Sequence, residues 1–176
     1  MNVLETIDKK DIRDLLGKGW LTHDGMWFYH TYQALGIDQA NTLNKSAIRS
    51  IAPIEINRVK KVLGVGEEKI ESLETLKDFM DKALELILPE SVFLKFHFGT
   101  SSNNIFHWEW EKGECFAFKG MTQIGTIDEY SCGVMYRIEC WLEALGTKFA
   151  MNPQIDKCIM HSTGVCSGDI RVFSGE

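Results

Sequence analysis

The sequence has no run of basic residues and no long apolar segment, and these absences exclude several classes of protein. Its 19 lysines and arginines stand against 25 aspartates and glutamates, which gives a formal net charge of -6. A nucleic-acid surface needs clustered cations for phosphate contacts, so we expect no nucleic-acid partner. No apolar run approaches the roughly 18 residues of a membrane-spanning helix, so we expect no membrane partner either.

Several sequence motifs are also missing. The chain has neither the G-x4-G-K-[ST] loop nor the G-x-G-x-x-G fingerprint of phosphate-binding sites, and no C-x2-C pair. Residues 1–14 are too polar and acidic for a secretory signal. Since the five cysteines are odd in number, free or metal-bound thiols are favoured over a complete disulfide framework. We therefore expect a reducing, cytoplasmic location.

A chain of 176 residues is long enough for one domain, expected to span residues 1–176. Residues 1–89 form its predicted helical part. The clearest helix has an apolar stripe from Leu73 to Ile87, capped by Ser72 and closed by Pro89.

Further helices are predicted earlier in this part, at residues 8–17 and 22–36, with a break at Gly19. Another begins at Asp38 and should kink or split at Pro53, because proline lacks the amide donor.

Residues 90–176 form the predicted sheet-plus-helix part. Apolar and polar residues alternate, which predicts strands at 92–98, 105–111 and 115–119. A helix ending near Leu145 follows, and residues 155–160 and 169–173 are predicted to form a hairpin. The predicted class is therefore α+β, with N-terminal helices followed by an antiparallel sheet made of a three-stranded meander, a helix and a C-terminal hairpin.

All five cysteines lie in the second part of the chain. Cys158-x2-His161-x4-Cys166 resembles half of a zinc site, and the remaining cysteines are candidates for the other half. The alternative is that the thiols are small buried apolar groups, as free cysteines often are. The predicted metal-binding residues, with zinc as the candidate cofactor, are Cys115, Cys132, Cys158, His161 and Cys166.

Other residues suggest a ligand pocket. Arg137 and Cys140 lie within one helical turn of each other. Trp27 and His30 suggest either an aromatic pocket wall or plain core packing, and His107 belongs either to a metal-binding strand face or to a solvated one. The predicted ligand-pocket residues are Trp27, His30, His107, Tyr130, Arg137 and Cys140.

Two strings of residues resemble known families. They are Trp20…Asp24-Gly25-x-Trp27-Phe28, and Cys115-x4-Gly120-Met121…Tyr130-x-Cys132-Gly133…Arg137…Cys140-Trp141…Cys158…Gly164-x-Cys166…Asp169. They are similar to an uncharacterised prokaryotic family of unknown function (DUF6125-like). The C-terminal half also resembles the aminothiazoline-carboxylate hydrolase-like proteins and, more distantly, the vinyl-reductase-type small-ligand domain. This resemblance implies an α+β fold with a pocket between helices and sheet.

Three hypotheses for function follow. The first is a cytoplasmic, sensor-like module that binds a small molecule or a metal in a cysteine-rich pocket. The second is a hydrolase of a small cyclic amide or thiazoline-like substrate, with Cys132 or Cys140 as nucleophile and a histidine as base. The third is an obligate oligomer, such as a homodimer through the aromatic-rich N-terminal helices.

Overall fold

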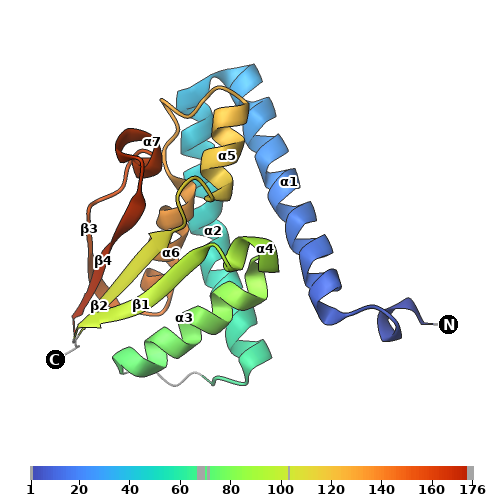
Figure 1. Ribbon diagram of the computed structural model, residues 1–176, viewed down its shortest axis with the longest axis vertical. Helices are drawn as coiled ribbons and strands as arrows, with labels where there is room; N and C mark the ends of the chain where they lie inside the picture. Colours follow the sequence, from blue (N-terminus) through green and yellow to red (C-terminus); the bar gives the residue numbers. More distant parts are fainter. Residues whose placement is uncertain (1, 67–69, 71, 103, 174–176) are drawn as a thin grey trace.

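The computed structural model describes residues 2–66, 70, 72–102 and 104–173, and it confirms the α+β class (Figure 1). The helices are η1 Val3–Glu5, α1 Lys9–Leu35, α2 Ile37–Leu63, α3 Leu73–Ile87, α4 Glu90–Phe93, α5 Phe116–Gln123, α6 Gly133–Ala144 and α7 Ile159–Thr163. The strands are β1 Phe96–Ser102, β2 Ile105–Trp110, β3 Lys148–Asn152 and β4 Cys166–Phe173. None of these helices, within the described residues, has the length and apolar character needed to cross a membrane.

The first two helices are longer than predicted. The predicted break at Gly19 is wrong, because α1 continues without interruption from Lys9 to Leu35. Each helical glycine costs about 1 kcal/mol relative to alanine, which packing offsets. A glycine is required at Gly17, where an added Cβ would lie 2.9 Å from Pro89 Cγ. Helix α2 likewise runs through Pro53, so the predicted split there is wrong.

Helix α3 agrees with its prediction. The Ser72 hydroxyl accepts from the Thr75 amide, and the Thr75 hydroxyl accepts from the Ser72 amide, which forms a capping box. The apolar stripe is buried, since Leu76, Phe79 and Met80 are each at most 3% exposed.

The sheet is antiparallel with strand order β1-β2-β4-β3. The predicted strand at residues 115–119 is wrong, because helix α5 starts at Phe116 and buries Ala117 and Met121 at four-residue spacing. The predicted strand at 155–160 is wrong as well. Instead, β3 at Lys148–Asn152 pairs with β4, and α7 begins at Ile159.

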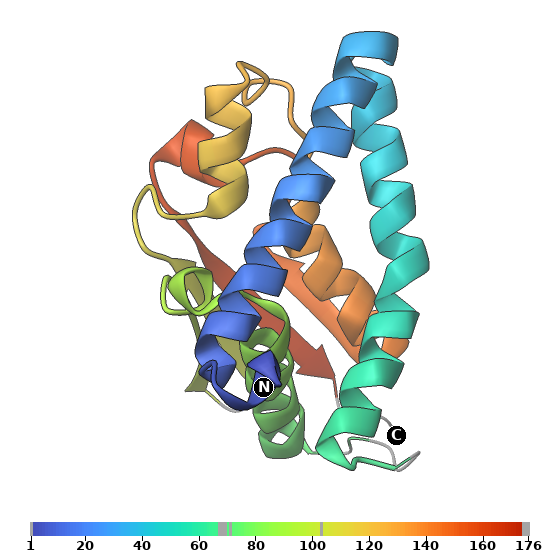
Figure 2. The same cartoon turned by 90° about the vertical axis from the view of Figure 1, so that its right-hand side faces the viewer.

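The helices cover one face of the sheet (Figures 1 and 2). Phe106, Trp108 and Trp110 of β2 point to this side and are at most 3% exposed. They belong to one hydrophobic cluster that includes Ile56 of α2 and Met80 of α3. Segments distant in the sequence therefore share a core, and the starts of α5, α6 and α7 lie at its edge.

Candidate functional site

Four of the buried cysteines each lie at the start of a helix or strand. Cys115, Cys132 and Cys158 are the N-cap residues of α5, α6 and α7, and Cys166 is the first residue of β4. Their exposed fractions lie between 5% and 8%, and all four are free thiols. We call these four residues the cysteine cluster.

Backbone pairing brings the segments of the cysteine cluster together. A β-bridge joins Ser131 to Lys157, and the Cys132 amide donates to the Asp156 carbonyl at 2.7 Å. This places Cys132 next to the segment that holds Cys158.

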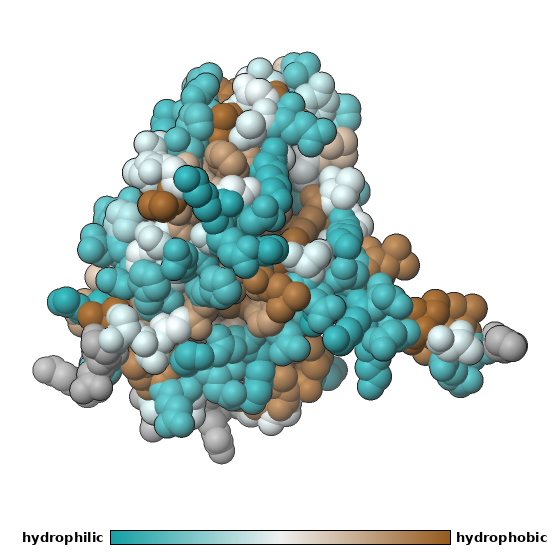
Figure 3. All heavy atoms as spheres, in the orientation of Figure 1, coloured by the Kyte–Doolittle hydropathy of each residue, from teal (hydrophilic) through white to brown (hydrophobic). Residues whose placement is uncertain are grey.

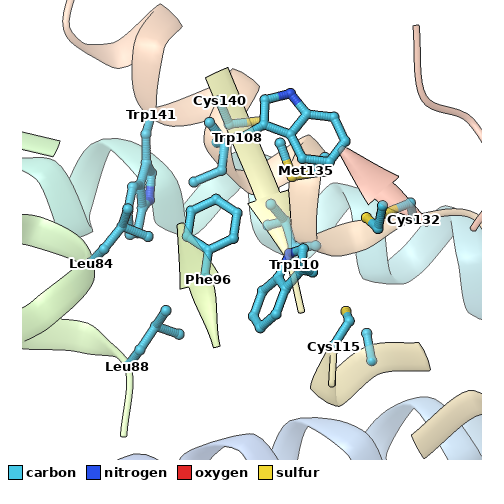
Figure 4. Packing of buried hydrophobic residues seen from close by; sticks show 14 of the residues in the cluster. Leu84, Leu88, Phe96, Trp108, Trp110, Cys115, Cys132, Met135, Cys140 and Trp141 are labelled. Atoms are coloured by element: carbon cyan, nitrogen blue, oxygen red, sulfur yellow. The ribbon is translucent and has the colours of Figure 1, made fainter. Parts of the chain in front are cut away.

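Cys166 and Cys115 are both placed near Trp110 of β2. Cys166 pairs with Trp110 in the register of β2 and β4. The Trp110 ring lies 6.0 Å from that of Phe116, the residue after Cys115. In Figure 4, Cys115 and Cys132 lie on the same side of Trp110.

The thiols of the cluster lie near enough to affect one another's ionisation. Burial raises the pKa of Cys115 to about 12, and the nearby thiols of Cys132 and Cys158 contribute to this rise. Burial also raises the pKa of Cys132 to about 11, with a smaller contribution from Cys158. The pKa of Cys166 is raised by burial first, and then by the other three thiols. Cys115, Cys132 and Cys166 are therefore neutral near pH 7 when no metal is bound.

Backbone amides oppose this rise at two of the cysteines. The amides of Ala117 and Phe118 lower the pKa of Cys115, and those of Val134 and Met135 act on the pKa of Cys132 in the same direction. These amides belong to the first turns of α5 and α6, where N–H groups have no partner within the helix. Such amides stabilise a thiolate once it forms.

Cys140 lies apart from the cysteine cluster, in the middle of α6. It is 4% exposed, and the groups that affect its pKa are Arg49, Tyr136 and nearby glutamates rather than other thiols. Burial is the largest cause and raises the pKa of Cys140. This thiol is as buried as those of the cluster but has different neighbours.

His161 does not face the cysteines. Its Nε2 lies 2.7 Å from Asp128 Oδ1, and its side chain is 40% exposed. Among the residues that the structure describes, no three His, Cys, Asp or Glu side chains are placed where they could hold one metal ion.

The predicted ligand-pocket residues on α1 lie at the surface. Trp27 is 66% exposed, and its Nε1 donates to His23 Nε2 at 3.3 Å. His30 is exposed, with its ring 5.2 Å from that of Tyr29.

The other two aromatic residues of that set occupy different places. The Tyr130 hydroxyl is buried and accepts from the Gly133 amide at 3.0 Å, so it supports the start of α6. His107 lies on the sheet face opposite the helices, where its Nδ1 is 2.9 Å from Asp169 Oδ1. The structure therefore does not bring the six residues of the predicted pocket together.

Arg137 is the member of that set that lines an internal cavity. This cavity has a volume of about 40 Å³ and is otherwise lined by apolar and aromatic side chains, including Trp20 and Trp110. The Arg137 guanidinium donates to Glu55 Oε1 and lies 4.8 Å from the Trp20 ring centroid. Trp141 Nε1 donates to the other Glu55 oxygen at 2.7 Å.

Sequence reasoning missed the part of Glu55 and Trp20 in this arrangement. A signal for Glu55 exists, because it lies on the apolar face of α2 with Ala52, Ile56 and Val59. A carboxylate on a buried face needs a cationic or donor partner. A larger open groove between α1 and α2 was also missed, since its walls depend on how α1, α2, α3 and α4 pack together.

Comparison with known proteins identifies the family but not a function. No curated protein and no solved structure matches the chain significantly. A family model described as a family of unknown function, DUF6125, matches residues 5–95, which cover α1, α2 and α3. The chain therefore belongs to the DUF6125 family.

Proposed function

We propose that this protein is a zinc-binding module in which the cysteine cluster supplies four thiolate ligands. The observation that supports this most is that buried thiols from four separate segments lie near enough to affect one another's ionisation, although within the described residues their side chains do not yet converge on one point. Tetrahedral Cys₄ sites are a common form of structural zinc site, and thiolates are soft ligands that suit this ion.

The positions of the cysteines also favour a metal over simple packing. Three of them are N-cap residues, a position at which Ser, Thr, Asp and Asn are preferred because their oxygens accept amide hydrogen bonds. None of the three has a side-chain capping hydrogen bond. A capping hydrogen bond therefore does not account for cysteine at these positions, whereas a metal-bound thiolate near free helix amides would.

Zinc binding would require two changes at the cluster. The thiols would lose their protons, which couples metal affinity to ionisation. Their side chains would also turn toward a common centre at about 2.3 Å from each sulfur, the Zn–S distance. Because the ligands come from the starts of α5, α6, α7 and β4, the ion would hold these four segments together.

The hydrolase alternative has less support. A nucleophilic cysteine needs a lowered pKa and a base within hydrogen-bond reach. The pKa values of Cys132 and Cys140 are both raised, with burial as the largest cause. The ring nitrogens of His107 and His161 lie against Asp169 and Asp128 instead. The same thiol measurements that test for zinc also test for a reactive nucleophile.

Elemental analysis of tag-free protein tests the zinc proposal. We expect about one equivalent of zinc in the wild type. Cys115→Ser and Cys158→Ser should lower this content at least severalfold, while Cys140→Ser, an equally buried thiol outside the cluster, should leave it unchanged. If a ligand variant folds poorly, the wild type still provides a test, because a chelator should lower its melting temperature. Protein without zinc, or zinc retained in both ligand variants, would disprove the proposal.

A further inference from the structure

Helices α1 and α2 diverge along their length and leave an open groove between them. In Figure 2 they lie close together near the Gly36 turn and separate toward the start of α1, with α6 visible behind them. The groove has a volume of about 740 Å³, and the end of α3 and the start of α4 line its base. This volume lies within the range of roughly 300–1,000 Å³ found for small-molecule sites.

The walls of the groove are mainly apolar. Ile12, Leu16 and Trp20 of α1 face Ile51 and Val59 of α2 across it, and Ile87 of α3 lies at its base. Leu16 is 67% exposed, although its neighbours in the groove are apolar. An apolar chain or ring lying here would remove this surface from water, which favours binding.

The groove also contains an incompletely satisfied cation. Arg13 Nη1 donates to the Glu85 carbonyl at 3.3 Å. The guanidinium also forms two long ion pairs, Nη1 with Glu85 Oε1 at 3.7 Å and Nη2 with Glu90 Oε1 at 3.8 Å. Arg13 Nε and Nη2 are buried without a hydrogen-bond partner within the described residues. Buried donors in proteins nearly always have an acceptor, so these two nitrogens indicate that one is missing.

The charges around the groove favour an anionic group. Arg58 lines the groove, is exposed, and forms no ion pair with any described part of the chain. Each carboxylate in the lining already has a cationic partner: Glu55 is bound by Arg137, Glu85 pairs with Arg13, and Glu90 forms an ion pair with Lys10 at 3.3 Å. A guanidinium whose donors are not all satisfied, such as that of Arg13 or Arg58, binds carboxylate or phosphate oxygens well.

Trp20 connects the groove to the interior. Trp20 lines both the groove and the small cavity of about 40 Å³, and its ring lies against the Arg137 guanidinium. A ligand in the groove would therefore contact this indole. Trp20 provides a fluorescence signal for binding and a route by which an apolar tail could reach the cavity.

We propose that the α1–α2 groove binds an amphipathic carboxylate, with its apolar chain against Leu16 and Trp20 and its head group at Arg13 and Arg58. This site shares no residue with the cysteine cluster, so either proposal can fail while the other stands. The competing occupant is a second copy of the chain, because Val3 and Leu4 are 61% and 68% exposed on a projecting N-terminal segment (Figure 3).

Sodium decanoate, with the neutral decanol and the cationic decylammonium as matched probes, tests the site in the whole chain. Titration calorimetry and tryptophan fluorescence should detect decanoate binding at least tenfold tighter than binding of either comparison probe, since only decanoate has a charged acceptor for Arg13. In Trp20→Phe the fluorescence change should be largely lost. Zinc content should not change on titration.

Variants separate the head-group contact from a structural role of Arg13. Arg13→Gln and Arg58→Gln should each weaken decanoate binding about tenfold and leave decanol binding within twofold. Lys61→Gln, an exposed cation of α2 that does not line the groove, should alter neither. If Arg13→Gln folds poorly, Arg58→Gln remains decisive because its side chain is exposed and unpaired within the described chain.

Three results would overturn the proposal. Equal binding of decanoate and decanol would mean that the groove is apolar without selectivity for an anion. Unchanged decanoate binding in both arginine variants would place the head group elsewhere. Absence of decanoate binding, together with a dimer in light scattering that Leu16→Asp dissociates, would identify a second copy as the occupant.

Discussion

Glu55 of α2 and Arg137 of α6 form an ion pair almost closed to solvent, with side-chain exposures of 10% and 15%. Trp141 Nε1 donates to the second carboxylate oxygen at 2.7 Å, so both oxygens of Glu55 are satisfied. The pair joins two helices that pack on each other; Glu55 lines the open groove and Arg137 lines the small cavity. The ion pair therefore fixes α2 and α6 to each other on the covered face of the sheet.

Removing one partner of this pair should be costly. Glu55→Leu leaves the Arg137 guanidinium buried without a counter-charge, and we expect the free energy of unfolding to fall by about 3–5 kcal/mol. Urea denaturation of the purified variant measures this change. The double variant Glu55→Leu/Arg137→Met removes both charges and should recover at least about 1 kcal/mol of the loss.

A second ion pair between the same two helices is the control. Arg49 Nη1 and Glu143 Oε2 lie 3.1 Å apart, with side-chain exposures of 58% and 49%. Because solvent screens this pair, Glu143→Gln should cost less than about 1 kcal/mol. Equal losses in Glu55→Leu and Glu143→Gln would contradict the importance of burial.

Gly168 of β4 should tolerate no side chain. An added Cβ would lie 2.6 Å from the Asn152 carbonyl oxygen and 2.8 Å from Trp108 Cζ2, and neither a paired backbone nor a buried indole can move away easily. Gly168→Ala should therefore destabilise the protein by about 1–3 kcal/mol, measured by thermal unfolding. Gly120→Ala in α5 has nothing within 4 Å of the new Cβ and should instead stabilise it by about 0.5–1 kcal/mol. A stable Gly168→Ala variant would mean that β3 and β4 pack less closely than described.

Glu139 of α6 should make stability depend on pH. Burial, followed by the nearby Glu143 carboxylate, raises the pKa of Glu139 in the folded protein, while Lys45 and Arg49 partly oppose this. As pH rises past the ordinary glutamate pKa, the unfolded chain ionises before the folded one, so folding stability falls until the folded pKa is passed.

Replacing this carboxyl by a neutral amide should remove the effect. Glu139→Gln should be more stable than the wild type at about pH 7, by no more than about 1 kcal/mol because Glu139 is only partly buried, and the advantage should shrink near pH 4. Denaturant unfolding at both pH values measures the difference. If Glu139→Gln were instead stabilised more near pH 4 than near pH 7, folding would lower the pKa of Glu139 rather than raise it, which would contradict the account.

The sequence predicted best where one local signal dominates. Helix α3 has a wide apolar stripe, a capping serine and a closing proline, and all three agree with its structure. Prediction failed where tertiary packing overrides a local signal. The glycines of α1 and Pro53 of α2 usually interrupt helices, but both helices bury residues on either side of them against the core.

The candidate site was predictable only in part, for a related reason. The short Phe116-Ala117-Phe118 alternation fits a strand or a helix equally, and the helix forms. That Cys115 and Cys158 lie at helix starts could not be derived from their spacing. His161 was grouped with the cysteines because it is near them in sequence, whereas its ring faces Asp128. The groove depends on the angle between α1 and α2, which no local pattern specifies.

Residue-resolved thiol alkylation, followed by mass spectrometry, is the most direct test of the zinc site. In tag-free protein, Cys115, Cys132, Cys158 and Cys166 should resist alkylation together and become reactive together when a chelator removes the metal. Cys140 lies outside the cluster and should react at the same rate before and after chelation. If the four thiols respond independently, or if the chelator changes none of them, the cysteine cluster is not a zinc site.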